Sequence, residues 1–163
     1  MLKMGYAEVD ITPTKPMETV GFGREDNMSR GILKPLLAQV SLWEEEGLGC
    51  LITIDSLGFT KELTDVLRDR VSGVLQITVD KVMVCFSHCH SAPNAGVEKE
   101  YYDMVCGRIE GAVINAREKL CEVCVGWGNA KVTIGVNRRQ KTEPLDKRAG
   151  VLKVCNAGSG VLE

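Results

Sequence analysis

The only two histidines of the chain, His88 and His90, stand two positions apart in the segment FSHCHSAPNAG, residues 86–96. In an extended segment the side chains at i and i+2 point to the same side, so both imidazoles can face one point. An H-x-H pair can in this way give a zinc ion two nitrogen ligands, while the remaining ligands come from elsewhere. The alternative interpretation is two surface histidines in a turn.

A catalytic zinc ion needs three protein ligands and one open position. The third ligand would have to be a carboxylate or a thiolate, because no third histidine exists. Asp55, at the end of the apolar run LITID, is the first candidate and Asp10 the second, although we favour a turn or supporting role for Asp55. Cys89 lies between the histidines and points to the opposite face, where we expect it to pack as a small hydrophobic residue.

The elements around these residues alternate between strands and helices. The apolar run VMVCF precedes the histidines and Pro93 follows them, which places the pair just past the C-terminal end of a buried strand, where α/β folds put their sites. We expect CLITID to be covered on both faces. The patterns predict a first strand in YAEVDITPT, a long loop over 14–35, a hairpin with strands at 36–43 and 48–55, a helix capped by Thr60, a helix over 98–120, a second hairpin turning at Asn129, a polar loop over 138–148 and a strand GVLKVC.

This order predicts an α/β fold with a mixed β-sheet and two main helices packed on it. At the end of the chain, NAGSG is typical of a turn and VLE begins another strand that stops after three residues. We therefore expect the sheet to be incomplete at its C-terminal end and the chain to be the front part of a longer protein, a frayed tail being the alternative. An open sheet edge would also invite pairing with a second copy, giving a homo-oligomer.

Composition limits the class of protein. The 163 residues suffice for a single domain spanning 1–163, and 44% hydrophobic with 26% charged residues is typical of a globular protein. The net charge of -2 and the absence of a basic stripe argue against nucleic acid as a partner. No apolar run is long enough for a transmembrane segment or a signal peptide, so we expect a soluble, cytoplasmic protein.

The chain has seven cysteines, an odd number, and most lie in apolar runs, which indicates reduced, buried thiols. Cys121 and Cys124 form a C-x-x-C motif. A redox or metal role for that motif requires a helix start or a second pair, whereas CEVCVGW is typical of a strand. A redox protein using these two thiols is therefore the weaker hypothesis.

Several segments resemble parts of the N-terminal catalytic domain of the neutral/alkaline non-lysosomal ceramidase family, and they occur in the same order along the chain. The segment VCFSHCHSAPNAG resembles the family hallmark T-H-T-H-S-G-P-G, but Ser87, Cys89 and Ala92 differ from it, and Asn94-Ala95 replaces the glycine pair after the proline. The other matching segments are GYAEVDITP, VGFGR, GILKPLLAQVSL, LITIDSLG and VNRR.

The resemblance implies a zinc-dependent amide hydrolase that splits an N-acyl amide such as ceramide into an amine and a fatty acid. It implies that His88 is a zinc ligand, that His90 lies beside the metal as a proton-transfer or anion-stabilising group, and that Arg138 reaches the active site. It also implies that the remaining ligands come from later in the family's chain, so this chain alone would be inactive. The alternative function is a non-catalytic fragment or binding module that keeps the fold without a metal site.

Overall fold

The computed structural model describes residues 1–137, 139 and 144–160. It divides into two compact parts, one formed by Leu2–Cys121 and the other by Met1 together with the residues from Glu122 onward. The first part holds the histidines and both helices. The second part is a β-hairpin.

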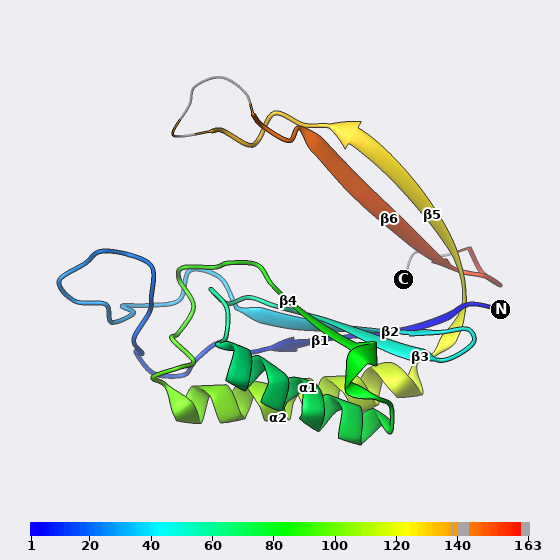
Figure 1. The fold of residues 1–163 in the computed structure, drawn as a ribbon, viewed down its shortest axis with the longest axis horizontal. Coiled ribbons are helices and arrows are strands. Elements are labelled where there is room, and N and C mark those ends of the chain that lie inside the picture. Colours follow the sequence, from blue (N-terminus) through cyan, green and yellow to red (C-terminus); the bar gives the residue numbers. More distant parts are fainter. Residues whose placement is uncertain (138, 140–143, 161–163) are drawn as a thin grey trace. The chain divides into compact units, whose positions relative to one another are not determined.

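The first part contains a mixed sheet with the strands β1 Lys3–Asp10, β2 Leu37–Glu44, β3 Leu48–Ile54 and β4 Val82–Phe86. Their order in the sheet is β4-β3-β2-β1. Strands β1 and β2, and β2 and β3, pair antiparallel, whereas β3 and β4 pair parallel (Figure 1). The bounds of β2 and β3 lie within one residue of the predicted strands at 36–43 and 48–55. The prediction succeeds because the charged run at 44–46 and Gly47 separate two apolar runs. A short 3-10 helix at Val79–Lys81 precedes β4.

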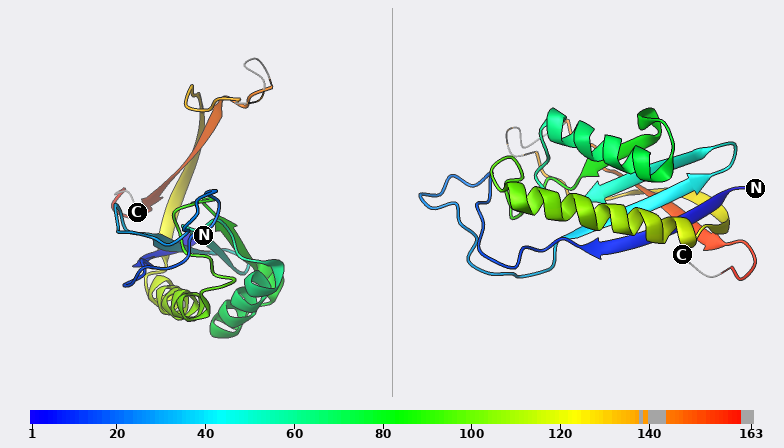
Figure 2. Two further views of the ribbon diagram at one scale, coloured as in Figure 1. Left: turned by 90° about the vertical axis from the view of Figure 1, so that its left-hand side faces the viewer. Right: turned by 90° about the horizontal axis from the view of Figure 1, so that it is seen from below.

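Both predicted helices are present and cover the same face of this sheet (Figure 2). Helix α1 spans Lys61–Leu75 and begins at Thr60, whose hydroxyl accepts a hydrogen bond from the Leu63 amide. Helix α2 spans Lys99–Glu118 and packs closely on β1: a Cβ at Gly5 would lie 2.0 Å from the Ala116 carbonyl oxygen. The expected α/β fold, a mixed sheet with two helices packed on it, is confirmed.

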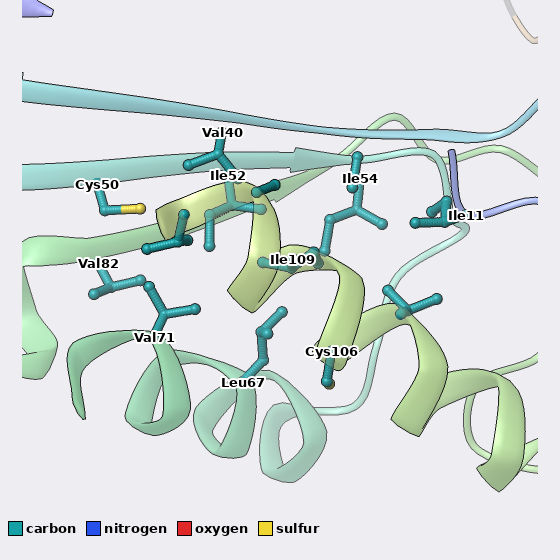
Figure 3. Close-up of a cluster of buried hydrophobic side chains, with 14 of the residues drawn as sticks. Ile11, Val40, Cys50, Ile52, Ile54, Leu67, Val71, Val82, Cys106 and Ile109 are labelled. Atoms are coloured by element: carbon teal, nitrogen blue, oxygen red, sulfur yellow. The ribbon is translucent and has the colours of Figure 1, made fainter. Parts of the chain in front are cut away.

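The hydrophobic core lies between the sheet and the two helices (Figure 3). Helix α1 contributes Leu67 and Val71, and α2 contributes Ile109, all fully buried against Ile52 and its neighbours. Helix α2 buries one apolar stripe, formed by Tyr102, Val105, Ile109, Ala112, Val113 and Ala116. This core holds the strands in the register that sets the position of the following loops.

The opposite face of the sheet is more open than the sequence suggested. In β3, Cys50, Ile52 and Ile54 are buried, whereas Leu51 and Thr53 remain partly exposed. The expectation that both faces of CLITID are covered is therefore wrong for the residues that the structure describes. The expected buried strand VMVCF alternates too: Val82 is buried, while Met83 and Cys85 face away from the helices and are exposed. Strand β4 takes one end of the strand order, and the helices cover a single face.

The second part also corrects the prediction. Strand β5, Cys121–Lys131, runs straight through Asn129 and pairs antiparallel with β6, Arg148–Asn156. Asn129 lies opposite Gly150 in the middle of the ladder, so it makes no turn. The Val132 amide donates to the Lys147 carbonyl, so the pairing of the two arms continues past Asn129. The predicted strand VLE at the end lies outside the described residues.

Replacing Ile109 with alanine should lower the free energy of unfolding by about 2–5 kcal/mol, because the site is fully buried and neighbouring groups relax only partly into the cavity. The matched control is Ile114→Ala on the same helix, where the side chain is 51% exposed and the expected change is within about 0.5 kcal/mol. Urea denaturation of both variants measures the difference. Equal destabilisation would contradict the assignment of the core face of α2.

Thiol reactivity should separate the two faces of the sheet. Burial raises the pKa of the Cys50 thiol to about 12, so little thiolate is available. Cys85, one strand away, is exposed. At about pH 8, iodoacetamide should alkylate Cys85 in the folded protein and Cys50 only after unfolding. Peptide mass spectrometry at several times measures both rates, and similar rates would show that Cys50 is not protected.

Candidate functional site

Several chain segments leave the sheet from one edge. Strands β3 and β4 are parallel and end together at Ile54 and Phe86. Strand β2 is antiparallel to both of its neighbours, so it starts at this same edge, where its first residue, Leu37, faces Asp10, the last residue of β1. The loop before β2, the turn after β3 and the histidine segment after β4 therefore meet here (Figure 1). The sequence predicted a site past the end of a buried strand. The parallel pairing of β3 with β4 brings the ends of both strands to this edge, where α/β folds commonly place their sites.

Backbone hydrogen bonds continue the parallel pairing past the strand ends. The Ser87 amide donates to the Ile54 carbonyl at 3.0 Å, and the Cys89 amide donates to the Ser56 carbonyl at 3.0 Å. Ser56 itself is buried. The segment that carries the histidines is thus attached along the segment after β3, and its backbone position does not depend on the histidine side chains.

Asp55 fixes the start of β2. Its amide donates to the Leu37 carbonyl at 2.9 Å, and its Oδ2 accepts from the Leu37 amide at 3.1 Å. The carboxylate thus has the supporting role that we favoured. Asp10 is likewise engaged locally: the Thr12 amide donates to its Oδ1 at 2.7 Å, and hydrogen bonds from the Thr12 side chain and backbone lower the pKa of Asp10.

The two imidazole rings lie together, as expected. Their centroids are 4.9 Å apart and their planes are at 79°. The reason differs from the predicted alternation along a strand, because His88 has a φ of 58° and therefore adopts the left-handed conformation. This conformation is uncommon for residues other than glycine, and it turns the chain out of its extended path at this position.

A carbonyl group orients the His88 ring. Its Nδ1 lies 3.0 Å from the Leu57 carbonyl oxygen, which can only accept a hydrogen bond. Neutral His88 in this contact carries its proton on Nδ1 and presents the lone pair of Nε2. A histidine that binds a metal through one nitrogen commonly donates from the other in this way.

His90 rests on the loop over residues 20–24. The centroids of the His90 and Phe22 rings are 5.6 Å apart in an edge-on arrangement. The Arg24 guanidinium lies over the Phe22 ring, 5.3 Å from its centroid. Gly21 has a φ of 102°, and a Cβ there would lie 2.0 Å from His90 Nδ1. Sequence reasoning had not identified Gly21 or Phe22 as supports of His90. The available signal was the Gly-Phe-Gly sequence within a long loop.

A pocket of about 670 Å³ opens on another side of the histidine segment. Asp55, Ser87, Cys89 and Ser91 contribute polar groups to it, while residues 12–16 and 29–36 supply much of the apolar wall. Neither histidine is among the described residues of its lining. Cys89 lines this pocket and is half-buried, so it is not enclosed in the core as expected.

The described residues match a zinc ion only in part. Two imidazoles on one tetrahedral zinc, with Zn–N bonds of about 2.0–2.1 Å, have centroids roughly 5 Å apart, which the observed pair meets. Within the described ranges, however, no group of three or more His, Cys, Asp or Glu side chains is placed to hold a metal. Arg138, the other expected active-site residue, lies outside the described residues.

Replacing Gly21 with alanine should displace the His90 ring, because the new Cβ would lie 2.0 Å from its Nδ1, too close for unbonded atoms, and the positive φ disfavours a side chain. The imidazole signals of His90 should shift in long-range ¹H–¹⁵N NMR spectra, while those of His88 change less. The control is Gly23→Ala, where a Cβ would meet nothing within 4 Å. Unchanged His90 signals in the Gly21 variant would contradict this packing.

Two solved structures share this fold. One is described as the neutral ceramidase from Pseudomonas aeruginosa, with a TM-score of 0.80, 14% identity and coverage of 99% of this chain and 30% of the other. The other is described as a ceramidase complexed with C2, with a TM-score of 0.82, 15% identity and the same coverage. No protein-family model and no curated protein matches the sequence. The chain thus has a ceramidase-like fold and spans 30% of the length of each of these structures.

None of the described helices is long and apolar enough to cross a membrane.

Proposed function

We propose that this chain supplies the N-terminal part of a zinc-dependent amide hydrolase related to neutral ceramidase. The observation that carries the proposal is the pair of imidazoles, 4.9 Å apart, at the edge where three strands of a ceramidase-like fold end. The likeness of fold supports the reaction class, and the ring pair supports a place for the metal.

In this proposal His88 offers Nε2 to zinc, because its Nδ1 faces the Leu57 carbonyl. His90 is the second nitrogen donor at the same point, or the group that exchanges a proton with the substrate amide beside the metal. Its contacts with Gly21 and Phe22 hold the ring close to His88. Arg138 stays a proposed active-site residue. When bound, zinc would lower the pKa of a coordinated water molecule and polarise the amide carbonyl.

The substrate class is an N-acyl amide, with a lipid amide such as ceramide as the specific proposal. The neighbouring pocket of about 670 Å³, walled by Ile32, Leu33 and Leu36, could accept an apolar chain. The odd number of cysteines in the sequence accords with the proposed cytoplasmic location. A homo-oligomer formed through an open sheet edge also stays a proposal.

The second candidate is a non-catalytic module that keeps this fold without binding metal. The finding that favours it is the missing third donor among the described residues. The two candidates differ in whether the imidazole pair takes up zinc at all.

Zinc titration followed by calorimetry should separate them. The exposed Cys85 and Cys124 could bind zinc themselves, so the background for the experiment is Cys85→Ser/Cys124→Ser. We expect weak binding of one zinc ion, lowered about 10–100-fold or more by His88→Asn, since loss even of a group that supports a ligand has effects of that size. Asparagine suits the variant because it tolerates the left-handed conformation at this position.

The folded state provides the control. His88→Asn should leave the midpoint of urea unfolding nearly unchanged, because the His88 side chain is exposed and its replacement removes no volume from the core. No zinc binding in the background protein, or binding that His88→Asn leaves intact, would favour the non-catalytic module.

A catalytic zinc ion needs three protein ligands, and the described residues bring only the two imidazoles together, so the 163-residue chain should not hydrolyse ceramide or a simple amide. In a longer form of the protein that does hydrolyse amides, His88→Ala should abolish both activity and zinc uptake. Hydrolysis by the 163-residue chain itself, measured by release of fatty acid, would show that our ligand assignment is wrong.

A further inference from the structure

Two cysteines face each other across the β5–β6 hairpin. Cys124 lies on β5 and Cys155 on β6, and the antiparallel register pairs them directly. Both thiols are free, Cys124 exposed and Cys155 half-buried. Directly opposed residues on antiparallel strands have Cα atoms about 4.5–5.5 Å apart, which lies within the range that a disulfide spans.

Backbone hydrogen bonds show which kind of pair this is. The Ala157 amide donates to the Glu122 carbonyl at 2.9 Å, and the Val132 amide donates to the Lys147 carbonyl at 2.7 Å. Glu122 lies opposite Ala157, and Val132 lies opposite Lys147, in the same register that pairs Cys124 with Cys155. Along an antiparallel ladder, hydrogen-bonded pairs alternate with non-hydrogen-bonded pairs. Counting two residues on from Glu122 makes Cys124–Cys155 a hydrogen-bonded pair, in which Cα atoms lie about 5.5 Å apart.

This geometry permits a disulfide but strains it. Opposed Cβ atoms are about 4.5–5.5 Å apart, nearer the upper value in hydrogen-bonded pairs. Most disulfides need about 3.5–4.5 Å. Strained and accessible disulfides have higher reduction potentials and are the ones that open and close readily.

We propose that Cys124 and Cys155 are a redox-sensitive modification site that closes into a reversible cross-strand disulfide. The oxidant is a small-molecule disulfide of the glutathione type. The Cys124 thiolate attacks one of its sulfurs and forms a mixed disulfide, releasing the first glutathione thiolate. The Cys155 thiolate then attacks the Cys124 sulfur and releases the second. Two protein thiols lose two protons and two electrons, and one oxidised glutathione becomes two reduced molecules.

Cys121, Cys50 and Cys106 do not fit this role. Cys121 and Cys124, the C-x-x-C motif, lie on one strand with side chains on opposite faces and about 10 Å apart along it, so they cannot bridge. That geometry makes the earlier hypothesis of a Cys121–Cys124 redox pair wrong. Cys50 and Cys106 are buried in the core of the first part. Access to Cys124 is helped by its same-face neighbour Gly126, which has no side chain.

The test uses the full chain equilibrated with mixtures of oxidised and reduced glutathione, then alkylated and digested with trypsin without reduction. We expect a disulfide between the peptide that starts at Leu120 and the peptide that starts at Val154. The link should persist in Cys121→Ser and vanish in Cys124→Ser and Cys155→Ser. No link at any ratio, a link through Cys121, or links only between two chains would overturn the proposal.

A designed pair tests the strain. Val125 and Val154 are opposed one position along and form a non-hydrogen-bonded pair, in which the side chains are closer. In the Cys124→Ser/Cys155→Ser background, Val125→Cys/Val154→Cys should stay oxidised at a glutathione ratio that opens the native pair. We expect the native pair to need at least about tenfold more oxidising conditions for half-oxidation. Equal or easier oxidation of the native pair would contradict its assignment as the strained, reversible one.

Discussion

The parallel pairing of β3 with β4 is the constraint on which the candidate site depends. It brings the ends of both strands to one edge and continues beyond them, through the hydrogen bonds from Ser87 to Ile54 and from Cys89 to Ser56. Parallel strands need a crossover, and here α1 provides it while burying the core face of the sheet. The core therefore determines where the histidines stand, and the histidines do not hold the fold together.

Unusual backbone conformations gather where the two rings meet. His88 is left-handed, and Gly21, which lies against His90, also has a positive φ. Such conformations persist only where surrounding contacts fix them, and they are concentrated at functional sites. Here the Leu57 carbonyl, the Phe22 ring and the backbone bonds of Cys89 fix them. This local arrangement is a stronger argument for a site than the spacing of the two histidines alone.

Much of the first part could be predicted from the sequence, since apolar periodicity marks the segments that form helices and strands. Both helices and the β2–β3 hairpin follow from it, and the Thr60 cap follows from the residue type before the first turn. Strand order and side-chain exposure do not: VMVCF looks like a buried strand, yet it takes one end of the order and Cys85 is exposed. Asn129 looked like a turn, but the long ladder of β5 with β6 overrides its local preference. The approach of His90 to Gly21 joins segments far apart in the chain, so spacing could not reveal it.

The central claim is that His88 and His90 form one metal-binding point in a ceramidase-like fold. The most direct measurement is a zinc titration followed through the ¹⁵N shifts of the two imidazoles, in the protein with Cys85 and Cys124 replaced by serine. The account predicts that both rings respond along one binding curve, and that His88 binds through Nε2 while Nδ1 stays protonated toward Leu57. Rings that titrate independently, or do not respond to zinc while the protein stays folded, would contradict it.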